Sequence, residues 1–317
     1  MPVNYLHNHS EFNELLRAVE HQKKIELSLV EKDYWIMHCL YGLQKEGFEF
    51  ELKGGTSLSK GYSIIHRFSE DIDIRIKPPG DMGIKEGKND TKPEHCQKRK
   101  RYYDWLAGKI KIDGLNKIVR DTDFDNKKTY RSGGIRLYYK SAFPMIEGIK
   151  EGVLLEVGFD DVTPNAPLDI SSWAFDFAKE RGIKIIDNRA YQVRCYHPGY
   201  TFVEKLQTIV TKFRKQQETG DVPSNFMRHY YDVYCLLQND VVRNFIGTAE
   251  YKRHKKKRFP SKDQKLPLSE QEAFLLKNAE TRKHYEREYK KSSALYYQGQ
   301  PPFEEILDII SKKLNDL

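Results

Sequence analysis

A change of hydrophobic pattern near residue 197 constrains the fold of this chain more than any other feature. Upstream of it, segments with a two-residue period occur among segments of helical period, whereas downstream only helical periodicity is found. The break is the sequence His-Pro-Gly at 197–199, which interrupts regular structure. The pattern therefore predicts an α+β domain over residues 1–195, followed by a helical C-terminal domain over residues 196–317.

Individual elements follow from the same periodicity. Strands of the first domain are expected at 48–52, 71–76, 134–140 and 152–159, with a loop at 77–93. Its helices are expected at 10–21, 29–45 and 94–112, and a capping box of Ser28 and Glu31 opens the second of them. A further capping box, Ser269 with Glu272, predicts a helix to about residue 290. Helices at 201–217, 225–238 and 303–317 complete the second domain.

Composition indicates a folded protein of two domains. The 317 residues include 32% charged and 12% aromatic side chains, with a net charge of +8, which favours a polyanionic partner such as nucleic acid. No run of about 18 apolar residues predicts a membrane helix. The N-terminus lacks the basic and apolar regions of a secretory signal. The four cysteines form no CxxC pair, which argues against zinc and disulfides and favours a reducing cytoplasm.

The most informative segment is 51–76, in which a strand meets a double glycine and then a short helix. Gly54 and Gly55 let a phosphate approach the backbone, and the N–H groups of a helix N-terminus attract an anion. Thr56 and Ser57 add hydroxyl donors. Because Gly-Gly turns are common, the loop by itself is a weak indication of a phosphate site.

Carboxylates on the following strand strengthen that interpretation. Asp71 and Asp73 project from one face, and two neighbouring carboxylates repel each other unless a cation binds or one is protonated. Oxygen ligands of this kind suit Mg²⁺ with a nucleoside triphosphate. Glu156 is the one charge inside the apolar run 153–159, and it becomes a third ligand if its strand lies beside Asp71 and Asp73. The alternative is a set of solvated polar side chains on edge strands.

Two helical residues also stand out. Lys205 borders the apolar stripe of its helix, where it either contacts a triphosphate or extends its stem over the core. Asp232 is the one acid in the segment 226–237, and it either pairs with Arg228 one turn earlier or serves as an acid at the nucleotide or acceptor. The spacing leaves both alternatives open for each residue.

Together these segments resemble the nucleotidyltransferase toxins of the AbiEii/AbiGii family, which includes the MenT toxins. The sequence KGGTSLSKGYSIIHRFSEDIDIRI is similar to the family's nucleotidyltransferase motif. Further likeness lies in VEKDYW at 30–35, EKLQTIVTKFR at 204–214 and RHYYDVYCLL at 228–237. The resemblance covers about residues 28–238 with gaps, and it places neither 77–150 nor the segment after 240.

The resemblance implies a fold and roles for particular residues. The fold is that of DNA polymerase β-like nucleotidyltransferases, a mixed sheet with helices, followed by a helical C-terminal part. Gly54, Gly55, Thr56 and Ser57 correspond to the triphosphate loop, which Lys53, Lys60 and Arg67 flank. Asp71 and Asp73 correspond to the metal-binding carboxylates and Glu156 to the third. Lys205 corresponds to the catalytic or nucleotide-binding lysine, and Asp232 to the late essential acid.

The implied activity is Mg²⁺-dependent transfer of NMP from an NTP to an acceptor. In the MenT toxins the acceptor is the 3′ end of tRNA, so tRNA is the first acceptor to expect. An antitoxin from the same operon is expected to act without a stable complex, as in type IV toxin–antitoxin systems that serve in phage defence. The alternatives are a protein or small-molecule acceptor, or a module that binds NTP or RNA without turnover.

Most of the positive charge is local. Residues 252–265 contain eight Lys or Arg against Asp263, a net +7 that leaves about +1 for the rest of the chain. Such a patch can hold a phosphate backbone without reading its sequence. A solvated flexible loop is the equally weighted alternative.

Overall fold

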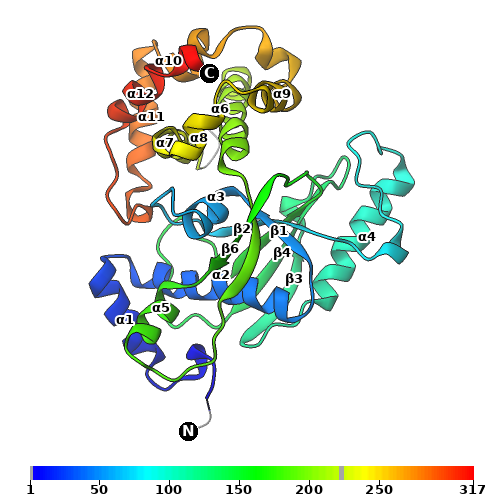
Figure 1. The fold of residues 1–317 in the computed structure, drawn as a ribbon, viewed down its shortest axis with the longest axis vertical. Coiled ribbons are helices and arrows are strands. Elements are labelled where there is room, and N and C mark those ends of the chain that lie inside the picture. Colours follow the sequence, from blue (N-terminus) through cyan, green and yellow to red (C-terminus); the bar gives the residue numbers. More distant parts are fainter. Residues whose placement is uncertain (1–2, 221–224) are drawn as a thin grey trace. The chain divides into compact units, whose positions relative to one another are not determined.

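A computed structural model describes residues 3–220 and 225–317 and divides the chain into two compact units. The mixed unit comprises Met1–Tyr62 and Phe68–Tyr196, and the helical unit comprises Ser63–Arg67 and His197–Leu317 (Figure 1). The predicted boundary at 195/196 thus lies one residue from the observed one. The additional finding is that a five-residue piece of the predicted first domain belongs to the helical unit.

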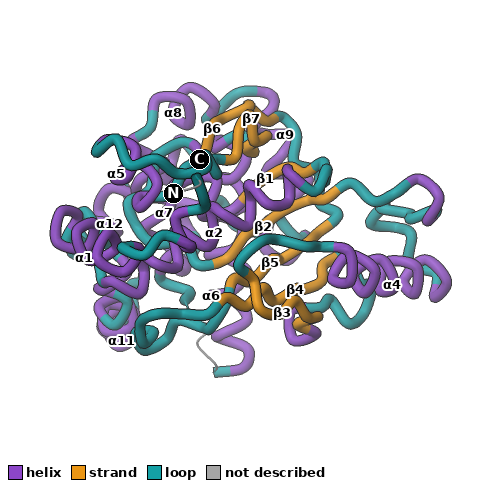
Figure 2. The backbone as a smooth tube through the Cα atoms, turned by 90° about the horizontal axis from the view of Figure 1, so that it is seen from below, coloured by secondary structure: helices purple, strands orange, loops and turns teal. Residues whose placement is uncertain are grey.

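Seven strands of the described chain form one mixed sheet in the order β3-β4-β5-β2-β1-β7-β6 (Figure 2). Strand β2 pairs in parallel with β5 and antiparallel with β1, and β1 pairs in parallel with β7. The strand bounds are β1 Phe50–Lys53, β2 Asp71–Ile76, β3 Leu115–Asp121, β4 Ser132–Tyr139, β5 Val153–Gly158, β6 Asn165–Ile170 and β7 Ala190–Tyr196. The four predicted strands are confirmed as β1, β2, β4 and β5.

Strands β3, β6 and β7 were not predicted from the sequence. β3 and β6 lie at the two edges of the sheet, where side chains stay partly exposed and the apolar alternation is weak. β6 also contains Pro167, which is tolerated at an edge because it need not donate to a second neighbour.

The helices of the mixed unit are α1 Phe12–Lys23, α2 Leu27–Lys45, α3 Gly54–Thr56, α4 Pro93–Lys109 and α5 Trp173–Glu180. The capping box predicted for α2 is wrong. Glu26 occupies the N-cap position and Ser28 lies inside the helix. Glu31 instead accepts hydrogen bonds from the Ala142 amide at 2.9 Å and the Ser141 hydroxyl at 2.8 Å, because α2 is buried and its polar groups need partners elsewhere.

The helical unit contains α6 Pro198–Thr219, α7 Arg228–Gln238, α8 Asp240–Phe245, α9 Ala249–Arg258, α10 Glu272–Leu275, α11 Ala279–Lys290 and α12 Phe303–Ser311. The single helix predicted after Ser269 is wrong. Leu276 adopts a left-handed conformation with φ 42° and ends α10. Asn278 then caps α11 by accepting from the Thr281 amide at 2.9 Å.

The segment Ser63–Arg67 is held in the helical unit by backbone contacts. His66 accepts a hydrogen bond from the Tyr297 amide at 3.2 Å, and its own amide donates to the Tyr231 hydroxyl at 3.3 Å. Arg67 forms an isolated β-bridge with Tyr296. The predicted nucleotidyltransferase motif is therefore divided between the two units, with Arg67 in one and Asp71 in the other.

Candidate functional site

Strand register aligns five residues, four of them charged, across five neighbouring strands of the mixed unit. Lys53 of β1 pairs with Asp73 of β2, and Asp73 pairs with Glu156 of β5. The row continues through Gly134 of β4 to Asp121 of β3. Directly paired residues project to the same face of a sheet, so this charged row lies on one face.

The acids of this row influence one another. The sequence left open whether Glu156 lies beside Asp71 and Asp73, and the structure places it in register with Asp73. Burial and the charges of Asp73 and Asp71 raise the pKa of Glu156 to about 8, against a smaller opposite effect of Lys53. Negative charge is therefore in excess here, as the spacing of the two aspartates predicted.

Chemically these side chains fit a hard divalent cation, because they offer carboxylate oxygens with uncompensated charge. Within residues 3–220 and 225–317, however, no three His, Cys, Asp or Glu side chains form a group that could hold a metal ion. The ligand set of Asp71, Asp73 and Glu156 stays a prediction: their strands are adjacent, and the side chains do not form a three-ligand cage.

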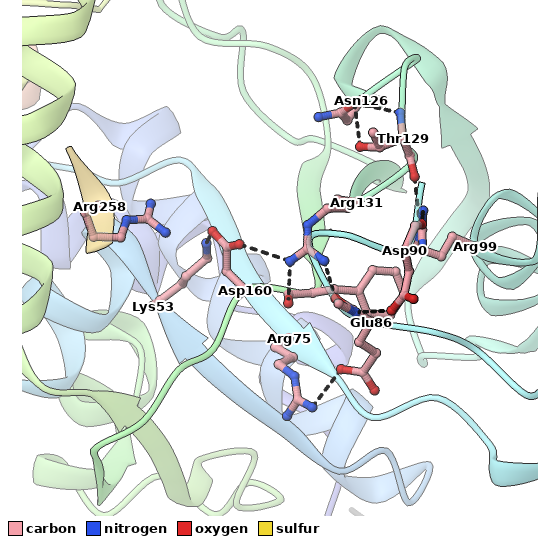
Figure 3. A network of polar contacts seen from close by, with 12 residues as sticks. Lys53, Arg75, Glu86, Asp90, Arg99, Asn126, Thr129, Arg131, Asp160 and Arg258 are labelled. Carbon is pink, nitrogen blue, oxygen red and sulfur yellow. Dashed lines mark hydrogen bonds and ion pairs between the residues drawn. The ribbon is translucent and has the colours of Figure 1, made fainter. Parts of the chain in front are cut away.

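Lys53 also lies near Asp160, an acid that follows β5 (Figure 3). Its ammonium lies 3.8 Å from a carboxylate oxygen of Asp160, and Arg131 lies 3.4 Å from the other oxygen. Arg131 also donates to the carbonyls of Phe159, at 2.9 Å, and Glu86. Lys53 therefore lies near two acids, Asp160 through this ion pair and Glu156 through the charge that opposes its raised pKa.

The double glycine brings the backbone against Asp73. Gly54 has φ +71°, and a Cβ added there would lie 1.9 Å from a carboxylate oxygen of Asp73, so only glycine fits. Thr56 is buried and its hydroxyl donates to the Asp71 carbonyl at 2.6 Å. Gly55 and Ser57 are buried too, and the helix continues as a π-helical turn over Ser57–Gly61. The loop is therefore fastened to the start of β2.

Lys60, predicted beside the nucleotide, lies at the buried Asp33 of α2. Its ammonium is 2.9 Å from the Asp33 carboxylate and 4.5 Å from the centre of the Trp173 ring. Asp33 also accepts from the Trp173 amide at 2.8 Å. In this structure the charge of Lys60 is matched within the protein.

A buried lysine on α2 was missed by the sequence analysis. Lys32, with 1% of its side chain exposed, donates to the Lys150 carbonyl at 2.5 Å and lies 3.9 Å from the carboxylate of Glu70. Burial lowers the pKa of Lys32 to about 8, while the charges of Glu70 and Asp71 oppose that shift. Three successive charged residues at 31–33 inside an apolar helix were the signal that could have identified it.

In the helical unit, Lys205 and Asp232 are brought together. The Asp232 carboxylate is fully buried, lies 2.8 Å from the Lys205 ammonium, and accepts two hydrogen bonds from Arg67 at 2.7 and 2.8 Å. Burial favours protonation, but Arg67 and Lys205 hold the pKa of Asp232 well below its usual range. The Arg67–Asp232–Lys205 triad therefore joins three residues that were predicted from separate motifs.

A glycine turn at a strand end, followed by paired carboxylates on a mixed sheet, is consistent with a nucleotidyltransferase-like fold. The model of the family "Nucleotidyl transferase AbiEii toxin, Type IV TA system" matches residues 38–309, and the chain belongs to this family. The match extends through 77–150 and most of the segment after 240, which the sequence resemblance had left unplaced. No curated protein and no solved structure matches the chain.

The described parts of the chain contain no helix with the length and apolar character needed to cross a membrane. This agrees with the absence of a long apolar run in the sequence.

Proposed function

We propose that this protein is a Mg²⁺-dependent nucleotidyltransferase that moves NMP from an NTP to an acceptor, as the toxin of a type IV toxin–antitoxin system. The observation that carries the proposal is the contact of Gly54 with Asp73 beside Glu156 and Asp71, in a chain of the AbiEii family. Excess negative charge next to a backbone turn that only glycine can form suits a metal-bound triphosphate.

Roles follow from residue chemistry. Asp71, Asp73 and Glu156 would hold Mg²⁺, which supplies Lewis acidity at the phosphates and lowers the pKa of the acceptor hydroxyl. Gly54, Gly55, Thr56 and Ser57 offer backbone N–H groups to the triphosphate, and Ser57 adds its hydroxyl, while the Thr56 hydroxyl fastens the loop to the Asp71 carbonyl. Lys205 supplies positive charge for phosphate oxygens, and Asp232 fixes its side chain at 2.8 Å.

In the reaction, an acceptor oxygen forms a bond to the α-phosphorus and the bond to the β-phosphate oxygen breaks. The acceptor loses its proton, and pyrophosphate leaves. We propose the 3′ end of tRNA as that acceptor, and a DNA polymerase β-like fold with a helical C-terminal domain as the scaffold. The antitoxin partner is expected from the same operon, without a stable complex.

The test is a transfer assay with purified protein, MgCl₂, each NTP labelled at the α-phosphate, and total tRNA. Label is expected in RNA, and Asp71→Ala should lower the rate at least about 1000-fold, which corresponds to roughly 4 kcal/mol of barrier. Glu49→Gln is the matched control, because its side chain is 62% exposed in a surface pair with Lys77.

The alternatives give different results in the same assay. Label in a protein or small molecule, but never in RNA, contradicts the tRNA assignment. NTP binding without pyrophosphate release, whatever acceptor is added, identifies a binding module. Full activity of Asp71→Ala contradicts the assigned site.

A further inference from the structure

The contact between α6 and α7 contains two lysines in contrasting surroundings. Lys205 is paired with Asp232, whereas Lys212 lies 3.2 Å from Nε2 of His229. Seven residues are about two helical turns, so both lysines lie on the same side of α6. Lys212 has no acidic partner among the described residues, and the Phe226 ring lies 5.9 Å from its ammonium.

The Lys212–His229 pair is rich in hydrogen-bond donors and lacks acceptors. An ammonium group only donates, so Nε2 of His229 accepts and the ring proton resides on Nδ1. In the described structure this Nδ1 is buried and has no hydrogen-bond partner. A buried donor without an acceptor is costly, and on the other side of the ring, at Nε2, lies an ammonium whose other N–H groups are also available.

The surrounding charges are positive as well. Burial, and to a smaller extent the charges of Arg228, Lys205 and Lys215, lower the pKa of Lys212 to about 8, with no acid acting in the opposite direction. Burial and the charges of Lys205 and Lys212 hold the pKa of His229 well below its usual range, so its ring is neutral. This region attracts an anion, because an anion would satisfy both the cations and the unpaired donor.

We propose that Lys212 and His229, next to Lys205, form a binding site for a polyphosphate, the triphosphate of a nucleotide or free pyrophosphate. Polyphosphate oxygens are acceptors with high negative charge, which matches the two unpaired donors. The inference extends the nucleotide contacts of the proposed function from Lys205 to two residues that the sequence analysis did not select. It rests on that function for the identity of the ligand.

Calorimetry with the full chain and inorganic pyrophosphate, without Mg²⁺, tests the site directly. Lys212→Met and His229→Phe should each weaken binding by about tenfold to 100-fold, the range for hydrogen bonds to charged groups. Lys212→Arg, which keeps the charge, should bind nearly as well as the parent. Lys283→Gln, at an exposed position of α11 in the same unit, removes one charge as a control and should change affinity less than about threefold.

Thermal melting separates lost binding from lost folding. Lys212→Met replaces a buried, uncompensated ammonium with an apolar side chain, so its melting temperature without ligand should equal or exceed the parent's. Pyrophosphate should raise the melting temperature of the parent more than that of Lys212→Met.

Three results overturn the proposal: no pyrophosphate binding by the parent, unchanged affinity of Lys212→Met, or loss of RNA affinity with pyrophosphate affinity intact. The third result would assign Lys212 and His229 to binding an RNA backbone instead. Asp71→Ala should retain pyrophosphate binding without Mg²⁺. If binding depends on Lys212 and no acceptor is ever labelled, the proposed function fails while this site stands.

Discussion

The two units carry opposite electrostatic imbalances. In the mixed unit, Asp71, Asp73 and Glu156 outnumber the nearby cations, and the pKa of Glu156 rises to about 8 after burial and mutual repulsion. In the helical unit two cations enclose Asp232, whose pKa falls below its usual range. The first region therefore carries an excess of negative charge and the second an excess of positive charge.

The largest expected effect is on the Arg67–Asp232–Lys205 triad. Asp232→Asn leaves two cations buried without their carboxylate, and removing one partner of a buried ion pair costs about 3–5 kcal/mol. The melting temperature and the urea midpoint should both fall strongly. The matched change in the mixed unit, Asp73→Asn, removes a repelling charge beside Glu156 and should leave the midpoint unchanged or raise it.

These two isosteric changes are expected to shift the unfolding midpoint in opposite directions, because one acid lies among cations and the other among acids. If both variants are destabilised to the same extent, the acids of the charged row are structural ion-pair partners rather than an excess of negative charge. If Asp232→Asn melts like the parent, the triad adds nothing to stability, and its distances of 2.7–2.8 Å have no energetic consequence.

The next effect is a dependence of stability on pH in the absence of Mg²⁺. Glu156 has a pKa near 4.5 when unfolded and about 8 when folded, so the folded state keeps a proton that the unfolded state releases. Stability should therefore fall between about pH 5 and 8, by up to about 1.4 kcal/mol per pH unit. Glu156→Gln should flatten this slope in denaturation measured at several pH values.

Repeating the stability measurements with Mg²⁺ tests whether the same carboxylates bind the metal. Metal binding requires the carboxylate form, so the melting temperature of the parent should rise with MgCl₂ more at pH 8 than at pH 5.5. A slope that stays the same in Glu156→Gln contradicts the assignment of the proton to Glu156. Equal metal effects at both pH values contradict a role of the carboxylates in binding it.

Local pattern was enough to predict the central part of the candidate site. The alternation at 71–76 placed Asp71 and Asp73 on one face of a strand, and the lone charge in 153–159 selected Glu156. Both strands are central: β2 buries every second residue, which gives the alternation, whereas β5 is buried at every residue but Glu156. The neighbourhood of Glu156 and Asp73 could not be predicted, because strand order is a long-range property.

The partners of buried polar groups also could not be predicted from the sequence. Arg136 is the one charge of β4, as Glu156 is of β5, and it pairs with Asp121 at 2.7 Å. Both capping boxes were wrong because the two glutamates accept other hydrogen bonds: Glu31 from the distant Ala142 amide, and Glu272 from the Asn278 amide six residues later. Lys32 and Lys212 depend on packing between elements, which periodicity does not encode.

The smallest expected effect concerns the basic segment 252–265, which belongs to the helical unit. Its first part is helix α9 and not a flexible loop, and Lys255 donates to the Leu317 carbonyl. The exposed lysines of α9 are Lys252, Lys256 and Lys257. Replacing these three by Gln should weaken RNA binding about tenfold and reduce its salt dependence by about two units of slope, with NTP binding unchanged.

A control with the same charge change lies on α11, where Lys283→Gln, Lys290→Gln and Lys291→Gln remove three exposed lysines of the same unit. Two of them pair with Glu286 and Glu288, so their charge is already offset. If filter binding at several salt concentrations gives equal losses for both triple variants, the effect is one of net charge. A loss confined to α9 assigns the RNA backbone to that helix, because clustered positive charge displaces counterions from a phosphate chain.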